Sequence, residues 1–83
     1  SGVIKGTVAN IAVAKQVLAS VVVGTETVSA YTNAEGVFQL NGIPAGTYTV
    51  TLTPDPTSGL LLKTVADVVV VNGQITNMGS ISM

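Results

Sequence analysis

Four carboxylates carry the only side-chain acid–base chemistry that this sequence offers near neutral pH. The chain of 83 residues contains no histidine and no cysteine, so catalysis by proton transfer would need two carboxyl groups in one pocket. The four candidates are Glu26, Glu35, Asp55 and Asp67. No two of them are close in sequence, and each falls on a separate turn or strand. We therefore expect isolated, solvated charges and no enzyme activity.

Nucleophilic and metal-dependent chemistry find equally little support. Serine and threonine are plentiful, but a hydroxyl nucleophile needs a neighbouring base, and no Gly-x-Ser-x-Gly, Ser-x-x-Lys or P-loop pattern occurs. Calcium needs several oxygen ligands that converge from one loop. The best loop, Asp55 with Thr57 and Ser58, supplies a single charge. We expect no bound metal and no cofactor.

The composition excludes two classes of partner. Three lysines and four acidic residues give a formal net charge of −1, and arginine is absent. Binding to nucleic acid depends on clustered basic side chains, so it is not expected. No apolar run approaches the roughly 18 residues of a membrane helix. The absence of cysteine leaves the cellular compartment open, and a core this small draws stability from aliphatic packing or from neighbouring protein.

Alternating apolar and polar residues predict a β-strand at Thr47–Thr53. Tyr48, Val50 and Leu52 fall on one face and four threonines on the other. The two prolines that follow end the strand, because proline cannot donate a ladder hydrogen bond. Short β-rich runs between turn formers predict further strands at Val3–Val8, Val17–Val23, Thr27–Thr32, Gly36–Leu40, Val68–Val71 and Ile75–Met83. About seven short strands indicate an all-β sandwich.

The connections are predicted from their turn formers. Asn72 and Gly73 favour a type I′ turn, which would join Val68–Val71 to the last strand as a hairpin. The segment 41–46 is rich in turn formers and is expected to be a loop. The segment Ala9–Ala19 could form a short helical turn, but we interpret it as a loop that enters the second strand.

A central group of residues has structural roles that follow from their types. Gly36 lies where a tight turn needs a positive φ. Phe38 is the only phenylalanine and is expected to anchor the core. Pro44 and Gly46 shape the entry to the next strand, and the Tyr48 hydroxyl is expected to bond to a backbone group, as corner tyrosines do.

The segments Thr32–Leu40 and Gly42–Val50 resemble the carboxypeptidase regulatory-like domains, with Asn33 in place of the usual aspartate. Gly2–Val8 is similar to the first strand of that family, and the residues from Gly73 to Ile81 are similar to its final hairpin. The resemblance implies a transthyretin-like (prealbumin-like) sandwich, seven-stranded and antiparallel with Greek-key topology. It also implies that residues 1–83 form a single domain of a longer bacterial protein. That protein would be secreted, periplasmic or at the cell surface. Ser1 and Gly2 would fit a cloning remnant.

Similarly folded repeats of Gram-positive adhesins contain a Lys–Asn isopeptide bond, and Lys5 with Asn77 would be the matching pair here. In those repeats a glutamate just after the tyrosine strand activates the reaction. The corresponding segment of this chain, Leu52–Pro56, has no glutamate, so we do not expect the bond.

Two apolar runs point to surfaces. Val21–Val23 and Val68–Val71 do not alternate between apolar and polar residues. This predicts burial on both faces, either under loops or against a neighbouring domain or a second copy of the chain.

Two functions remain as hypotheses. The first is a structural accessory module that acts as a spacer or support. The alternative is a module that binds glycan or protein through the loops Asn41–Ala45 and Pro54–Gly59 or through a sheet edge, although these loops lack an aromatic platform and Tyr31 is the only tyrosine outside the corner position.

Overall fold

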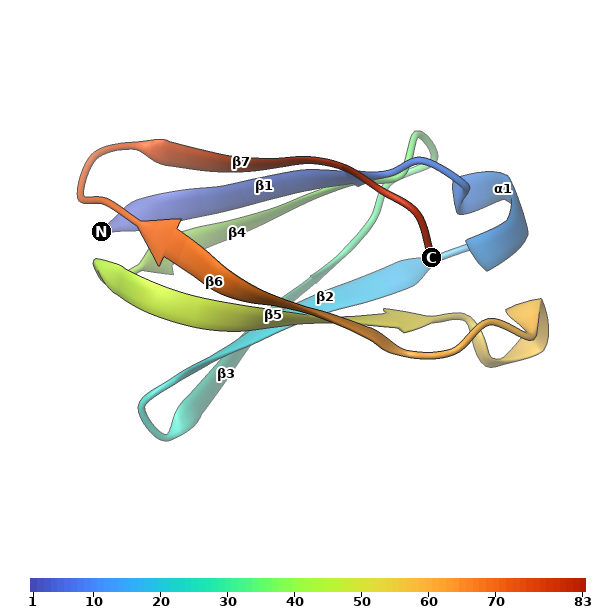
Figure 1. The fold of residues 1–83 in the computed structure, drawn as a ribbon, viewed down its shortest axis with the longest axis horizontal. Helices are drawn as coiled ribbons and strands as arrows, with labels where there is room; N and C mark the ends of the chain where they lie inside the picture. Colours follow the sequence, from blue (N-terminus) through green and yellow to red (C-terminus); the bar gives the residue numbers. More distant parts are fainter.

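The computed structural model describes residues 1–83, which fold into two facing β-sheets (Figure 1). One sheet has three strands in the order β4-β1-β7, and the other has four in the order β3-β2-β5-β6. The strands are β1 (Gly2–Val8), β2 (Val17–Val23), β3 (Glu26–Tyr31), β4 (Val37–Ile43), β5 (Gly46–Pro54), β6 (Lys63–Val70) and β7 (Ile75–Ile81). The prediction of an all-β, seven-stranded sandwich is confirmed.

The core lies between the sheets and is almost entirely aliphatic. Val50 and Leu52 of β5 are fully buried, while the threonines that alternate with the apolar residues of this strand face outward, as the period of two dictates. Phe38 is the largest buried side chain. It packs over Gly6, where an added Cβ would lie 2.6 Å from the Phe38 ring. The fourteen buried core residues are Ile4, Val8, Ala14, Val17, Ala19, Val21, Phe38, Leu40, Ile43, Val50, Leu52, Val68, Val70 and Ile81.

The sandwich is not wholly antiparallel, which corrects one part of the prediction. β7 pairs with β1 in parallel, while the other four strand pairs are antiparallel. The expected Asn72–Gly73 hairpin is therefore wrong, because β6 and β7 belong to different sheets. Gly73 has φ +74° and Asn72 does not have a positive φ, so the turn matches type II, not type I′.

The largest differences from the predicted elements occur in three segments. The segment Ala9–Ala19 contains a one-turn helix, α1 (Ile11–Ala14), which was interpreted as loop. β4 runs on to Ile43, so only two residues of the predicted loop 41–46 lie between β4 and β5. β6 begins at Lys63, five residues before the predicted Val68, and includes a bulge where Asp67 has φ +58°. Turn-forming residues inside bulged strands mislead a prediction that treats them as loops.

The valine strands are not buried on both faces. Val21, Val68 and Val70 point into the core, but Val22 is 62 % exposed and Val69 is 53 % exposed on the outer face. Loops of this chain therefore do not cover the outer face, and that alternative is wrong; burial against a neighbouring domain or a second copy stays a prediction. None of the helices has the length and apolar character of a membrane-spanning segment.

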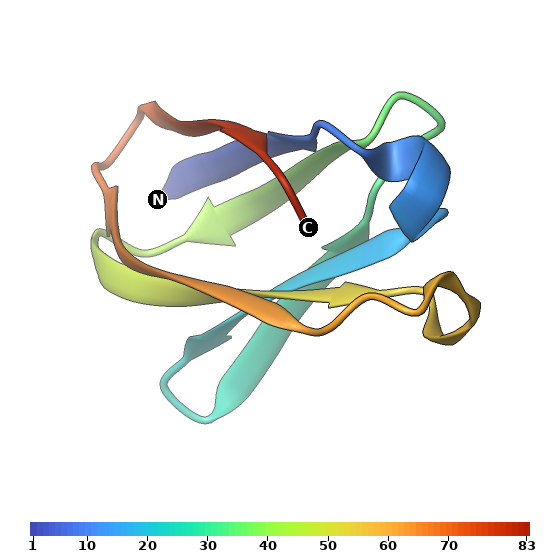
Figure 2. The ribbon, with the colours of Figure 1, turned by 45° about the vertical axis from the view of Figure 1, so that its right-hand side comes forward.

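The two ends of the sandwich have different compositions. One, here called the turn end, holds Ser1 and the Asn72–Gly73 turn, which hydrogen-bond to each other. The other, called the helical end, holds α1, the 3-10 helix η1 (Pro56–Ser58) and the C-terminal residue Met83, which bonds to Asn10. The N-terminus thus lies at the turn end and the C-terminus toward the helical end of a molecule whose longest extent is 35 Å (Figure 1). Figure 2 shows α1 and η1 together at the helical end.

Candidate functional site

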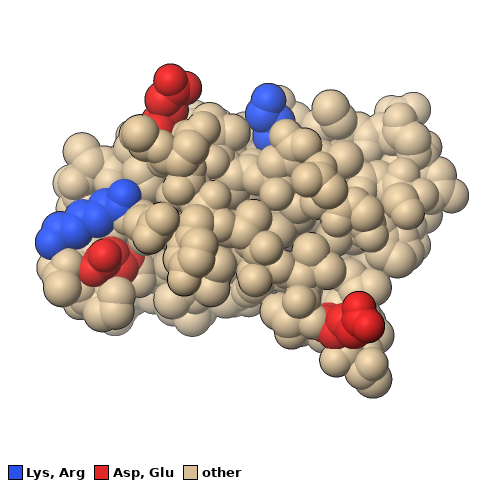
Figure 3. All heavy atoms as spheres, turned by 180° about the vertical axis from the view of Figure 1, so that it is seen from behind, with Lys and Arg blue, Asp and Glu red and all other residues tan.

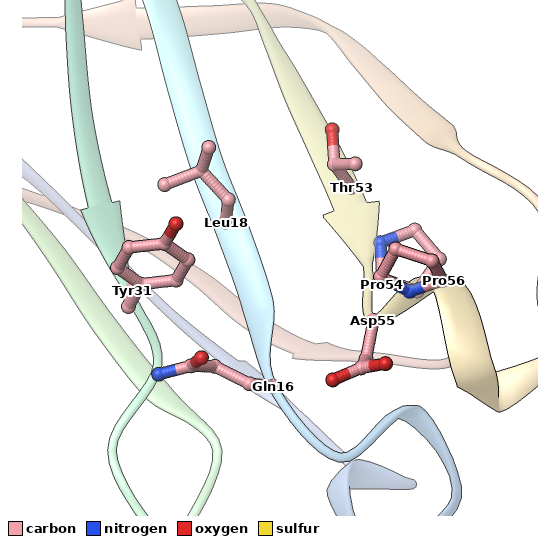
Figure 4. A pocket seen from close by; sticks show the side chains of 7 residues that line it. All are labelled: Gln16, Leu18, Tyr31, Thr53, Pro54, Asp55 and Pro56. Carbon is pink, nitrogen blue, oxygen red and sulfur yellow. The ribbon is translucent and has the colours of Figure 1, made fainter.

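A shallow hollow of about 220 Å³ opens at the helical end (Figure 4). It lies where β2 begins and where β3 and β5 end, so three neighbouring strands of the four-stranded sheet contribute to it. It is lined by Gln16, Leu18, Tyr31, Thr53, Pro54, Asp55 and Pro56. We take this hollow as the candidate site, because it combines an exposed aromatic ring with several polar groups.

The floor is one cross-strand row on the outer face of the four-stranded sheet. Leu18 of β2 pairs with Tyr31 of β3 on one side and with Thr53 of β5 on the other. Side chains directly opposite each other in a sheet lie on the same face within contact distance. Tyr31 is 62 % exposed, and its hydroxyl makes no hydrogen bond within the chain.

Thr32 fixes the position of Tyr31 from the buried side. The Thr32 Oγ1 accepts a hydrogen bond from the backbone N–H of Val17 at 3.0 Å, and the Thr32 N–H donates to the Val17 carbonyl at 2.9 Å. Thr32 is the one polar side chain that is buried in the structure. Since the end of β3 is held to the start of β2 by both groups, the backbone under Tyr31 has little freedom.

Asp55 forms the opposite wall and caps η1. Its Oδ1 accepts hydrogen bonds from the Thr57 N–H at 2.8 Å and the Thr57 hydroxyl at 2.6 Å, and the same hydroxyl accepts from Lys15 Nζ at 2.7 Å. The Thr57 hydroxyl and backbone bonds, with the charge of Lys15, lower the pKa of Asp55. The second carboxylate oxygen, Oδ2, has no partner within the chain.

Gln16 follows a strained turn. Lys15 has φ +68° and ψ −71°, and the Gln16 N–H donates to the Ala14 carbonyl at 2.9 Å. These are the angles and the bond of the less common γ-turn, which is unfavourable for a residue with a side chain. The turn is stabilised by the Ala14 carbonyl, which also accepts from the Asp55 N–H at 3.3 Å. Gln16 is thereby placed between Tyr31 and Asp55 (Figure 4).

The hollow contains one carboxylate and no base partner for it. Glu26 begins β3, Glu35 lies in the turn before β4, and Asp67 sits in the β6 bulge. No group of three or more acidic side chains lies close enough to hold one metal ion. Figure 3 shows few charged side chains on one face; one basic side chain lies beside an acidic one, and uncharged surface separates the others. The lining of the hollow can form hydrogen bonds and apolar contacts with a ligand.

The residues singled out from the sequence lie mostly away from this hollow. At the turn end, the Tyr48 hydroxyl donates to the Pro44 carbonyl at 2.7 Å, and Gly46 begins β5. Gly73 completes the turn that bonds to Ser1. Each of these contacts fixes backbone at the turn end.

The Asn33–Gly36 turn lies on the helical side and is also closed. The Asn33 Oδ1 accepts from the N–H groups of Glu35 and Val37, at 2.9 and 3.0 Å. Gly36 has φ +84°, and a Cβ there would lie 2.5 Å from the Val8 carbonyl oxygen. Only glycine fits both constraints.

Lys5 and Asn77 are direct partners in the parallel pair of β1 and β7. Both side chains are exposed, and the Asn77 Oδ1 accepts from the Gly79 N–H at 2.8 Å. An isopeptide bond needs a dry core around the two groups, so this surface pair does not provide the required environment.

Sequence reasoning named the loop 54–59 but missed the hollow itself. The row of Tyr31, Leu18 and Thr53 exists only because of the strand register, which joins residues up to 35 positions apart. Two features of the sequence could have indicated the hollow: Tyr31 at the end of a strand, and the Pro54-Asp55-Pro56 stretch.

The comparisons with known proteins concern the fold. No family model matches the chain, and no curated protein sequence matches it. The resemblance to carboxypeptidase regulatory-like domains therefore stays a hypothesis.

Two solved structures are similar to this chain. They are chains of type II Cohesin-X-Dockerin complexes from Acetivibrio cellulolyticus, one a C-terminal and one an N-terminal interface mutant. Each is 23 % identical over 96 % of this chain, with TM-scores of 0.69 and 0.68. The match covers 53 % of each solved chain, so this chain spans about half the length of the proteins it resembles. At this identity the likeness establishes the sandwich fold.

Proposed function

We propose that residues 1–83 form one non-catalytic module of a longer secreted or cell-surface protein, and that the module is a rigid spacer or support which contacts protein neighbours at its two ends. The finer assignment, a transthyretin-like domain of the carboxypeptidase regulatory-like family, rests on the motif around Phe38 and Tyr48. The observation that carries the function is the placement of exposed apolar side chains beside the two chain termini.

At the helical end, the apolar surface lies next to the C-terminal segment. Leu61 is 86 % exposed, and Leu62 and Val13 are more than half exposed. Lys63 Nζ donates to the Ser82 carbonyl at 2.9 Å, so the side chain at the start of β6 reaches the last residues of the chain. A protein module that follows in sequence would meet this surface first.

At the turn end, Val71 and Ile75 are more than half exposed. They flank the Asn72–Gly73 turn, which bonds to Ser1. Of the eight large hydrophobic side chains that are exposed, six thus lie at the two ends, when Tyr31 of the hollow is included. Exposed apolar groups in one place favour contact with other protein, and an elongated shape with opposite termini suits a chain that continues in both directions.

The solved structures support the same reading. Each similar chain is about twice as long as this one and belongs to a type II Cohesin-X-Dockerin complex. A sandwich of this kind is there one part of a longer polypeptide in a protein assembly.

The experiment compares amide chemical shifts of the module alone with those of the same module in its longer natural polypeptide. We expect shift changes and slower amide exchange around Val13, Leu61, Leu62, Val71 and Ile75. Replacing Leu61 and Leu62 with glutamine should remove the changes at the helical end, whereas Val22→Gln, on the open sheet face, should leave them. Identical spectra at both ends, or a gene that encodes nothing beyond this chain, would contradict the proposal.

A further inference from the structure

We propose that the hollow at the helical end binds one neutral pyranose unit of a polysaccharide. This inference concerns the lining of the hollow and is independent of the end contacts proposed above. It rests on four features of the site: an exposed aromatic ring, unpaired polar groups around it, rigid walls and a single negative charge.

The first feature is the ring of Tyr31 beside Leu18. A pyranose presents a flat face of C–H groups, and such a face packs against an aromatic ring while its hydroxyls remain at the rim. Tyrosine suits this role, since it joins an apolar ring to a polar hydroxyl. Tyr31 is the one aromatic side chain that is mostly exposed, whereas Phe38 is buried and Tyr48 is half-buried.

The second feature is the set of polar groups that surround the ring. The Tyr31 hydroxyl, the Gln16 amide, the Thr53 hydroxyl and Asp55 Oδ2 have no hydrogen-bond partner within the chain, although other side chains at this end, such as Lys15 and Thr57, are paired. Together they present donors and acceptors. Adjacent hydroxyls of a sugar both donate and accept, and a carboxylate forms the stronger kind of bond with them.

The third feature is rigidity. The backbone under Tyr31 is held by the two Thr32–Val17 bonds, and Asp55 is held by Thr57 and by the Ala14 carbonyl. A site whose walls are already fixed loses little entropy when a ligand binds. The ligand then orders only the outer atoms of Gln16 and Tyr31.

The fourth feature is charge, which selects among sugars. Asp55 is the one ionisable acid of the lining, and the nearby ammonium of Lys15 is bonded to Thr57. The Lys15 charge offsets part of the Asp55 charge, but the free carboxylate oxygen can only accept a hydrogen bond, so an uncharged hydroxyl suits it better than an anionic sugar or a phosphate. A single carboxylate is also too few ligands for calcium, so the sugar must be held by direct hydrogen bonds.

The size and surroundings indicate a unit within a polymer. About 220 Å³ is below the roughly 300–1,000 Å³ of pockets for drug-sized ligands, so the hollow takes one ring and leaves the rest of a chain outside. The next row on the same sheet face is Ser29, Ser20 and Thr51. This uncharged hydroxyl surface continues from Tyr31 and Thr53 and gives adjacent sugar units a place to lie.

A proline-rich peptide is the main competing ligand for such a site. Grooves that bind the polyproline helix are lined by several aromatic side chains, and here only Tyr31 is available. The unpaired amide, carboxylate and hydroxyls around it favour the sugar.

The test is an NMR titration of the whole chain with cellohexaose, xylohexaose and mannohexaose, alongside an oligogalacturonate and a proline-rich decapeptide. We expect at least one neutral oligosaccharide to give saturable shift changes at Gln16, Leu18, Tyr31 and Thr53. Tyr31→Ala should weaken this binding about tenfold or more, and Asp55→Asn about fivefold, in line with the loss of one contact each. Leu61→Ala, at the same end but outside the hollow, is the matched control and should bind as the parent chain does.

Tyr31→Phe keeps the aromatic ring and loses only the hydroxyl. It therefore separates the contribution of the ring to sugar binding from that of the hydroxyl, and we expect it to retain most of the affinity. Three outcomes would overturn the proposal: no saturable shifts with any neutral oligosaccharide at tens of millimolar, binding that Tyr31→Ala leaves unchanged, or a stronger response to the oligogalacturonate or the peptide. None of them bears on the end contacts, which are measured at Leu61, Leu62, Val71 and Ile75.

Discussion

The two tyrosines lie at opposite ends of the four-stranded sheet and use their hydroxyl groups differently. Tyr48, at the turn end, is half-buried and donates to the Pro44 carbonyl. Tyr31, at the helical end, is mostly exposed and has no partner. The same residue type thus holds a loop in one place and is available to a ligand in the other.

Both tyrosines lie in hydrogen-bonded strands of the same sheet, and the two ends differ in how their side chains are bonded. At the turn end the polar groups are bonded to one another, and at the helical end the fixing is done by Thr32, Thr57 and backbone groups. That division leaves the outer side chains of the hollow free. It also predicts which substitutions affect stability and which affect binding.

The largest effect is expected from Thr32→Val. This change keeps the shape of the side chain but leaves the buried Val17 N–H without an acceptor, which costs roughly 1–3 kcal/mol of unfolding free energy. Urea unfolding measures the loss. Thr27→Val, at an exposed position of β3, the strand that Thr32 follows, is the control and should change stability by less than about 0.5 kcal/mol. Equal effects of the two variants would contradict the role given to Thr32.

The comparison of the tyrosines is tested directly by a pair of phenylalanine variants. Tyr48→Phe removes the bond to Pro44 and should lower the unfolding free energy by about 1 kcal/mol. Tyr31→Phe removes an unpaired hydroxyl and should leave stability within about 0.5 kcal/mol of the parent. If thermal unfolding shows the opposite order, the distinction between the two ends is wrong.

A smaller effect should come from the strained turn at Lys15. Lys15→Gly and Lys15→Ala both remove the bond from Nζ to Thr57, but only glycine adopts φ +68° without strain. Relief of that strain, set against the backbone entropy of glycine, should make the glycine variant more stable than the alanine variant by about 0.5–1 kcal/mol. Chemical denaturation of the two proteins side by side measures this difference, and a more stable alanine variant would show that the turn is unstrained.

The smallest expected effect is the pH dependence at Asp55. The pKa of this carboxyl is lowered from 3.8 in the folded chain, so its contribution to stability is complete above that value and is lost as the pH falls through the folded pKa. Asp55→Asn should remove this part of the acid dependence, as followed by unfolding at several pH values between neutral and acid. A parent and a variant with parallel pH profiles would rule the contribution out.

Several elements of the fold followed from local pattern. The alternation in β5 and the β-rich run of β2 predicted both strands closely, because the pleat imposes a period of two wherever one face is buried. The helix α1 and the first half of β6 were missed. The first is a single turn without a capping side chain, and the second contains a bulge at Asp67, so neither leaves a periodic signal.

The candidate site was predictable only in its parts. Tyr31 and the Pro54–Gly59 loop were both noted, but nothing local connects a strand end at position 31 with a strand end at position 53. Their contact passes through Leu18, a partner of both. Register between distant strands is decided by the packing of the whole sheet.

The sequence by itself determined the all-β class, the uncharged character of the surface and the absence of histidine and cysteine chemistry, since each depends on residue types and short-range spacing. Only the tertiary structure decided that β7 joins β1 in parallel, that Val22 and Val69 face outward, and that Tyr31, Gln16 and Asp55 surround one hollow. These features depend on contacts between residues far apart in the chain. Such contacts are set by how two sheets cover one core.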